Sequence, residues 1–259
     1  MKRILLLVSI LPIVLLLIFI YQQDRFQKEP VKTLSKAFLG GLLVIPLSLA
    51  MVILINQIWV SPTFFYSAFW EAGIPEELSK FLIFMLLIWR DRNFDEYFDG
   101  IVYATFIGLG FACVENIMYV YSSAKFSFGN GLWTGFARAI LSVPAHFLFG
   151  VIMGYFFSMA KFNKKGKRTV FLLTGLLLSI GCHGLFDWLL MVAGTLDNAL
   201  ACIIYIAFIA GDIFLWRIGV NYIRELQQES LIQSGKAPDD FSEYHHIDWN
   251  AGNRHKHRK

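Results

Sequence analysis

The stretch at residues 4–21, ILLLVSILPIVLLLIFIY, contains no charged side chain. A helix needs roughly 20 mostly apolar residues to cross a hydrocarbon core of about 30 Å, so this stretch is long enough to span a membrane once. Lys2 and Arg3 precede it, as in a signal peptide, but no small-residue cleavage site follows and the next residues are strongly polar. We therefore expect an uncleaved transmembrane helix here.

Six further apolar runs lie along the chain, at residues 38–60, 64–89, 100–121, 133–160, 169–194 and 199–218. The runs are continuous and do not alternate with polar residues, which excludes the strands of a membrane β-barrel. The 259 residues are 56% hydrophobic and 16% charged, whereas soluble domains carry about 25% charged residues. The sequence therefore predicts an all-α, polytopic transmembrane bundle of about seven spans, and excludes a soluble globule, a disordered chain and a secreted disulfide scaffold.

The basic residues predict how this bundle is oriented. Lys and Arg are concentrated after the first, third, fifth and last runs, at positions 25, 28, 32, 36, 90, 92, 161, 164, 165, 167, 168, 217, 224 and 236. Because loops rich in Lys and Arg stay in the cytoplasm, we expect the N-terminus outside and the C-terminus in the cytoplasm. This bias also accounts for the net charge of +4, so we expect the lipid bilayer, and no nucleic acid, as a partner.

Ionisable residues interrupt the apolar runs, although each costs at least about 2.5 to 3.5 kcal/mol on insertion scales and is a functional candidate for that reason. They are Glu76, Glu77, Lys80, Glu115, Arg138, His146, His183, Asp187 and Asp212. We interpret Arg138 as a snorkelling or structural charge, and Asp212 as a helix-packing partner.

Four of these residues lie at a similar depth. Counted from the charges that mark the expected cytoplasmic edge, Glu77, Glu115, His146 and His183 are 13 to 16 residues away, or about 20 to 24 Å at 1.5 Å per residue. Four groups on four helices thus share one layer in the outer half of the hydrocarbon core. The agreement predicts a single site that water reaches from outside.

Helical spacing adds detail to this site. Glu76 and Lys80 are four residues apart, so we expect them to pair on one face and Glu77, turned about 100° away, to stay unpaired. His183 and Asp187 have the same spacing, which lets the carboxylate orient the imidazole. Pro75 is compatible with the first turn of a helix or a broken helix start.

Carboxylates and two histidines around one point suit the hydrolysis of an amide bond. A Glu takes the proton from water as general base, and His or Asn donors, such as Asn116, could stabilise the oxyanion. The same groups could instead hold a metal that activates the water. The HExxH signature is absent, so the spacing does not demand zinc.

These residues also carry a resemblance to a known family. EELSK at 76–80 matches an EExxK pattern, FACVE at 111–115 matches FxxxE, and the histidine elements follow as SVPAH at 142–146 and HGLFD at 183–187. In this order, on four successive spans, the motifs resemble the PrsW family of intramembrane proteases, which is similar to the CAAX-processing and bacteriocin-immunity (Abi) membrane proteases. The likeness covers about residues 30–220.

The resemblance implies a multi-pass enzyme of the bacterial cytoplasmic membrane that makes the first, extracytoplasmic cut in a membrane-anchored anti-sigma factor. By this likeness the catalytic residues are Glu76, Glu77, Glu115, His146 and His183, supported by Lys80, Asn116 and Asp187. CAAX-type relatives have His in place of Glu115 and Asn in place of Asp187, so the roles of these two stay open. The cofactor also stays open, because the family is described both as metallopeptidase-like and as glutamate-dependent.

The chain then divides into three regions. Residues 1–36 hold the first span and a basic cytoplasmic loop, residues 37–220 the catalytic transmembrane bundle, and residues 221–259 a polar cytoplasmic tail.

Two other functions use the same residues: a proton- or cation-coupled transporter or channel with an intramembrane relay, and a non-enzymatic membrane protein that binds a partner helix. Transporters often show repeated halves, and we find none here.

Overall fold

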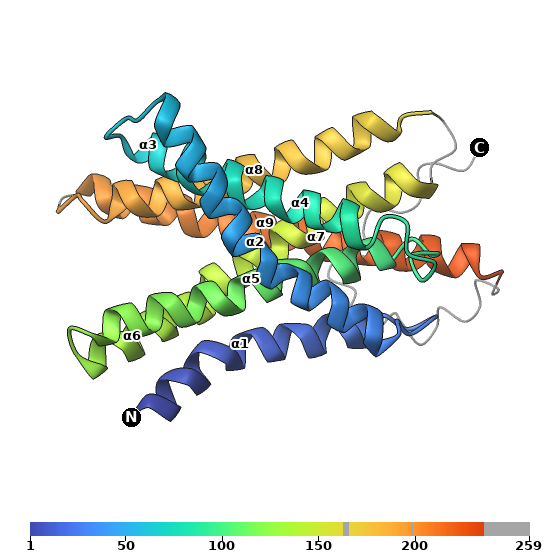
Figure 1. The fold of residues 1–259 in the computed structure, drawn as a ribbon, viewed down its shortest axis with the longest axis horizontal. Coiled ribbons are helices and arrows are strands. Elements are labelled where there is room, and N and C mark those ends of the chain that lie inside the picture. The colour runs from blue at the N-terminus through green and yellow to red at the C-terminus, as the bar shows by residue number, and fades with distance from the viewer. Residues whose placement is uncertain (163–165, 198, 236–259) are drawn as a thin grey trace.

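The computed structural model describes residues 1–162, 166–197 and 199–235, which form an elongated helical bundle (Figure 1). Its elements are α1 (Lys2–Gln23), α2 (Val31–Ile58), α3 (Phe64–Tyr66), η1 (Ser67–Gly73), α4 (Ile74–Leu87), α5 (Asp99–Ala124), α6 (Phe128–Ile140), α7 (Ser142–Phe162), α8 (Arg168–Ala193) and α9 (Ala199–Gln233). The η1 segment is a π-helix. The described residues contain no strand, so the prediction of an all-α bundle is confirmed.

Each of the seven predicted spans corresponds to a helical stretch. Five of them match single helices, α6 and α7 together form the fifth span over residues 128–162, and α3, η1 and α4 follow one another without a gap over residues 64–87. Within the described residues, 6 stretches are long and apolar enough to cross a membrane by length and composition. The stretch at 64–87 is not among them, because the π-helix divides it into shorter pieces.

The central helix of the bundle is α5, which α1, α2, α6 and α7 surround. Glycines allow two of these neighbours to come close. A Cβ on Gly41 of α2 would lie 2.3 Å from the Ile107 carbonyl oxygen, and a Cβ on Gly154 of α7 would lie 2.3 Å from the Gly100 carbonyl oxygen. Since small residues let membrane helices approach closely, these glycines hold α2 and α7 directly against α5.

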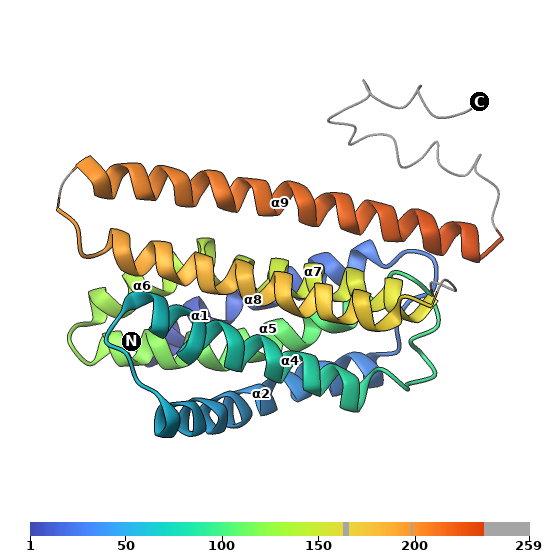
Figure 2. The same ribbon diagram turned by 90° about the horizontal axis from the view of Figure 1, so that it is seen from above.

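The last helix, α9, runs along the outside of the bundle beside α8 (Figure 2). We predicted that this span ends at residue 218, but the helix continues to Gln233. Packing explains the extension, because Leu226 and Leu231 are buried and the Ser230 hydroxyl accepts a hydrogen bond from the Phe98 backbone N–H at 2.9 Å. The remainder of the predicted polar tail, residues 236–259, lies outside the described residues.

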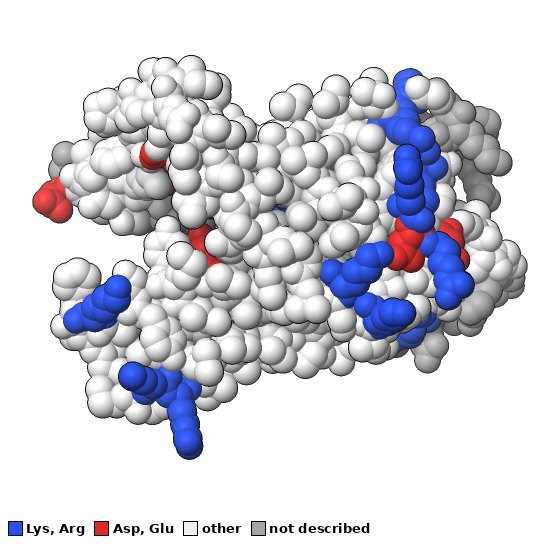
Figure 3. Space-filling view, in the orientation of Figure 1, with Lys and Arg blue, Asp and Glu red and all other residues white. Residues whose placement is uncertain are grey.

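Basic side chains gather at one end of the bundle, on the right in Figure 3. We call this the basic end; it comprises the loops at 24–30 and 88–98 and the neighbouring ends of α7, α8 and α9. The N-terminus lies at the opposite end (Figure 1). The described loops that the charge bias assigns to the cytoplasm therefore share one end; Lys164, Lys165 and Lys236 lie outside the described residues.

Candidate active site

The site begins where the π-helix η1 passes into α4. Pro75 has no backbone N–H, so it cannot donate to a carbonyl in the preceding turn. Just before it, the Ile74 N–H donates to the Phe69 carbonyl, five residues earlier, which is the spacing of a π-helix. The first turn of α4 then carries Glu76 and Glu77 into the interior of the bundle.

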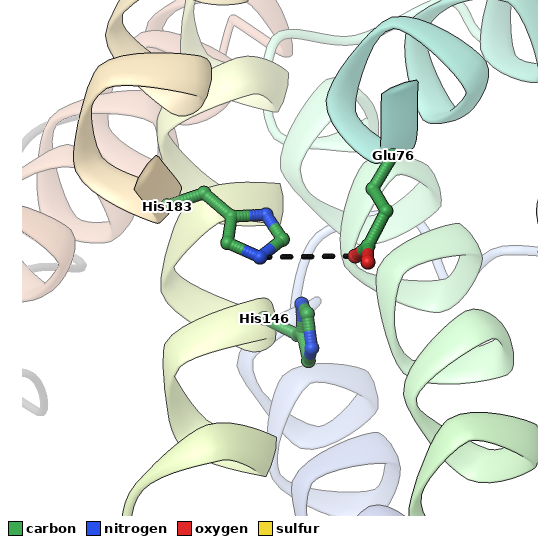
Figure 4. A group of neighbouring side chains, drawn as sticks. All are labelled: Glu76, His146 and His183. Atoms are coloured by element: carbon green, nitrogen blue, oxygen red, sulfur yellow. Dashed lines mark ion pairs between the residues drawn. The ribbon is translucent and has the colours of Figure 1, made fainter. Parts of the chain in front are cut away.

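Glu76 converges with two histidines from α7 and α8 (Figure 4). One ligand atom from each of Glu76, His146 and His183 lies within 4.8 Å of the other two. Glu76 Oε2 is 3.7 Å from His183 Nε2 and is buried without a hydrogen-bond partner. The two imidazole rings stand nearly perpendicular, with centroids 5.2 Å apart. The free carboxylate oxygen therefore faces a space bordered by both rings.

Glu77 holds the far side of His183. It is fully buried, its Oε1 accepts a hydrogen bond from Lys80 Nζ at 2.6 Å, and the same oxygen lies 2.8 Å from His183 Nδ1. The predicted pairing was therefore wrong: Lys80 pairs with Glu77, three residues away, and Glu76 instead faces His183 Nε2 at 3.7 Å. Burial explains the choice, because the more deeply buried of the two charges needs the nearby cation.

His146 is held in the same way from α5 and α6. Its Nε2 lies 2.9 Å from Glu115 Oε2, which also accepts a hydrogen bond from Arg138 Nη2 at 2.5 Å. Its Nδ1 lies 3.2 Å from Lys80 Nζ. Arg138, which we interpreted as a snorkelling or structural charge, is thus a direct partner of a site residue. Its position near the end of α6 carries no sequence pattern that would have revealed this contact.

The predicted supporting residues differ in what they contact. Asp187 Oδ2 lies 3.4 Å from His183 Nε2, the same ring nitrogen that faces Glu76. Asn116 does not face this space: its Nδ2 donates to the Ser9 carbonyl of α1 at 2.7 Å, and its Oδ1 accepts from Arg138 Nε at 2.9 Å. Asn116 therefore anchors Arg138 and α1, in contrast to the oxyanion donor that we expected.

Aromatic rings fix the orientation of the histidines. The Phe149 ring stacks on the His183 ring, with centroids 5.0 Å apart and an interplanar angle of 19°. The Phe111 ring meets His146 edge to face at 5.2 Å, and Lys80 Nζ lies 4.5 Å from the centre of the same Phe111 ring. Packing on one side and carboxylates on the other leave each imidazole little freedom to rotate. The arrangement is thus preorganised around Glu76.

The donor set also fits a metal ion. Two imidazoles and one carboxylate hold zinc in hydrolases, and carboxylates commonly orient such histidines from their other ring nitrogen. Here His183 Nε2 faces both Glu76 and Asp187, a position that suits a positive charge, and the buried Glu76 Oε2 lacks a donor. Glu76, His146 and His183 are the residues that would hold the ion.

Comparison with known proteins agrees with this geometry. Residues 29–211 match the sequence model of a family described as PrsW family intramembrane metalloprotease. The chain is 34% identical over 237 residues to Protease PrsW of Clostridioides difficile (strain 630), covering 89% of this chain and 94% of that protein. It is 39% identical over 185 residues to Protease PrsW of Geobacillus kaustophilus (strain HTA426), covering 71% and 78%.

A third relative, Protease PrsW of Bacillus subtilis (strain 168), is 33% identical over 226 residues, which cover 87% of this chain and 96% of that protein. No solved structure matches the chain. The family model and these relatives span most of the chain, including the five helices, α4 to α8, that carry the site. The chain therefore belongs to the PrsW family of intramembrane proteases and is a multi-pass membrane protein.

Proposed function

We propose that this protease activates a water molecule at Glu76 and uses it to cut a peptide bond in a membrane-anchored protein. The observation that carries the proposal is the Glu76 carboxylate, whose buried Oε2 has no hydrogen-bond partner and faces two fixed imidazoles. A carboxylate without donors is free to accept a proton. Of the other three carboxylates of the site, Glu77 pairs with Lys80, Glu115 pairs with Arg138, and Asp187 faces His183 Nε2.

The reaction then proceeds in two proton transfers. Glu76 accepts a proton from the water while the water oxygen attacks the peptide carbonyl carbon, and the same proton passes to the amine nitrogen as the C–N bond breaks. Glu77 and Glu115 hold His183 and His146 in orientation throughout. In the alternative with zinc, Glu76, His146 and His183 would hold the ion, which would lower the pKa of the water and polarise the carbonyl; Glu76 would then serve as a ligand and not as the proton acceptor.

We propose a membrane-anchored anti-sigma factor as the substrate, cut on its extracytoplasmic side. The depth of the site supports this side, because Glu115 lies 16 residues from Asp99 at the basic end of α5, about 24 Å along the helix. Figure 3 shows a cleft in the opposite end of the bundle, with acidic atoms at its floor. A substrate segment outside the hydrocarbon core would enter there.

Cleavage of a tagged single-span anti-sigma factor, co-expressed with variants of this protein, tests the proposal. We expect Glu76→Gln to lower cleavage by about 10²- to 10⁴-fold, because the proton acceptor is lost. Glu71→Gln is the matched control: it lies five residues earlier, and its carboxylate is bonded to Asn56 and Ser67. Full cleavage by Glu76→Gln at wild-type protein levels would overturn the assignment of Glu76.

The metal is tested on purified protein in detergent. We expect about one zinc per chain, loss of cleavage on treatment with a zinc chelator, and recovery when zinc is added back. Glu76→Gln should lower the zinc content, whereas Glu71→Gln should retain it. Undiminished cleavage in a metal-free sample would contradict a metal role and leave water activation to Glu76 alone.

A further inference from the structure

A second group of carboxylates lies at the basic end, in segments that the proposed hydrolysis does not use. Glu29 belongs to the loop between α1 and α2, Asp95 to the loop between α4 and α5, and Asp99 is the first residue of α5. One oxygen from each of these three, which we call the loop carboxylates, lies within 4.8 Å of the others. Since Asp99 and Glu115 are separated by about 24 Å of helix, the cluster is distinct from the candidate active site.

Two of the three loop carboxylates are buried and short of donors. Glu29 is 2% exposed and neither of its oxygens has a hydrogen-bond partner. Asp99 is 0% exposed; its Oδ2 accepts from the backbone N–H groups of Asp95 and Glu96, but its Oδ1 has no partner. A buried carboxylate without a donor is costly, and here several such oxygens face one another.

The described part of the chain forms no direct ion pair with this cluster. Within the described residues, no Lys or Arg is paired with Glu29, Asp95 or Asp99. Lys161 lies nearby, but its Nζ donates to the Trp89 carbonyl oxygen at 3.3 Å and lies 3.8 Å from the centre of the Phe94 ring. Among the residues that the structure describes, none neutralises the loop carboxylates directly, which leaves room for an ion from solution.

We propose that Glu29, Asp95 and Asp99 bind one hard divalent cation, Mg²⁺ or Ca²⁺. Carboxylate oxygens are the ligands that these ions prefer, at distances of about 2.0 to 2.6 Å, and oxygens on opposite sides of such an ion are about 4 to 5 Å apart. The spacing of the three oxygens fits that limit. Asp95 is exposed, so an ion and its remaining waters can enter from the solvent side.

The electrostatics of Glu29 favour a bound cation. Burial, reinforced by the neighbouring carboxylates Asp24, Asp95 and Glu96, raises the pKa of Glu29 to about 8. The carboxyl groups of Glu29 and Asp99 are also near enough to share a hydrogen bond when one of them is protonated. Removing this repulsion requires either a proton or a cation, and thermal unfolding at several pH values and metal concentrations separates the two.

Cation binding here would join segments that are far apart in the sequence. Glu29 and Asp95 come from different loops, and α9 reaches the same place, because Gln233 Nε2 donates to the Asp95 carbonyl oxygen at 2.8 Å. An ion bound by the folded state and not by the unfolded chain stabilises the fold by mass action. The ion would therefore stabilise the packing of the two loops and α9 at the basic end.

The test is thermal unfolding of the full chain in detergent, in a Glu76→Gln background that removes the carboxylate of the candidate active site. Starting from EDTA-treated protein, we expect Mg²⁺ or Ca²⁺ to raise Tm in a saturable way, by about 5 to 10 °C at a hundredfold excess over Kd. Electron paramagnetic resonance should show one bound Mn²⁺ per chain, displaced by Mg²⁺ or Ca²⁺. An unchanged Tm with no bound Mn²⁺ would overturn the proposal.

Substitutions of single carboxylates then identify which residues bind the cation. Glu29→Gln should abolish the rise in Tm and, in EDTA, should melt at or above the parent, because it removes a buried carboxyl group that the neighbouring carboxylates repel. Asp95→Asn should weaken Mn²⁺ binding at least tenfold. Asp91→Asn is the matched control, since it lies in the same loop but pairs with Lys36, and it should keep the full response.

Two further results would reject the cation site. If Glu29→Gln keeps the metal-dependent rise, the ion binds elsewhere. If Tm falls as the pH rises but ignores Mg²⁺, Ca²⁺ and Mn²⁺, the loop carboxylates share a proton. Neither result depends on cleavage, so the proposed function and this cation site stand or fall separately.

Discussion

The candidate active site and the loop carboxylates are both clusters of buried acids, but they are neutralised differently. In the active site the chain brings its own cations: Lys80 pairs with Glu77, and Arg138 pairs with Glu115. At the basic end the described residues form no such pair with the loop carboxylates. The difference follows from the surroundings, because charges inside the hydrocarbon core have less access to counter-ions from bulk water than charges beside a solvent-exposed loop.

Lys80→Met tests the buried ion pair of the candidate active site and should have the largest effect on stability among the variants considered. It leaves the fully buried Glu77 carboxylate without its cation. Removing one partner of a buried ion pair costs about 3 to 5 kcal/mol, so we expect a large drop in stability, measured by unfolding of the purified protein in detergent. The double variant Glu77→Gln, Lys80→Met should recover much of the loss; no recovery would show that Lys80 acts mainly through its other contacts.

Arg138→Lys should reduce cleavage by about 10- to 100-fold, because a lysine cannot reach Glu115 and Asn116 together as the guanidinium does. Arg138 acts on the site through Glu115 and His146, so the loss should fall on kcat with KM little changed. Measurement of both constants on a purified substrate checks this. A rise in KM alone would place Arg138 among the substrate-binding residues.

Ser230→Ala probes how firmly α9 holds the basic end. The change removes the acceptor of the buried Phe98 N–H, the residue just before Asp99. We expect a loss of about 1 to 2 kcal/mol in the free energy of unfolding. If the loop carboxylates bind a cation, part of this loss should disappear in saturating Mg²⁺, whereas an equal loss with and without the ion would uncouple α9 from that cluster.

Lys36→Met should have the smallest effect on the free energy of unfolding. The Lys36–Asp91 pair lies at the same end, but the Lys36 side chain is 42% exposed, and such pairs contribute about 0 to 1 kcal/mol because solvent screens them. Unfolding measurements at low and high salt should give nearly the same small difference. A loss as large as that of Lys80→Met would contradict the distinction between internal and solvent-exposed charges.

The helices of this fold could be predicted from the sequence because the membrane sets their length and composition. The predicted helix bounds were wrong where packing, and not hydropathy, determines the structure. In α9 the chain turns polar after residue 218, yet the helix continues because Leu226 and Leu231 find a buried surface. The π-helix η1 could not be predicted either, because its hydrogen-bond pattern leaves no mark in the apolar run.

The residues of the candidate site could be found from the sequence, but not their partners. Depth along each helix selected Glu77, Glu115, His146 and His183, since the rise per residue is fixed. The choice between Glu76 and Glu77 as the partner of Lys80 depends on how α4 is rotated, and spacing allowed both. Arg138 was identified as a charge within an apolar run, but its contact with Glu115 was not, and the loop carboxylates were missed, because only tertiary packing brings these residues to their neighbours.

The π-helix η1, just before Pro75, determines how α3 is rotated about the helix axis relative to α4. In a π turn one residue more is accommodated than in an α turn, so removing one residue from Ser67–Gly73 would swing α3 by about 100° relative to Glu76. The chain can therefore vary the outer half of this span without disturbing α4.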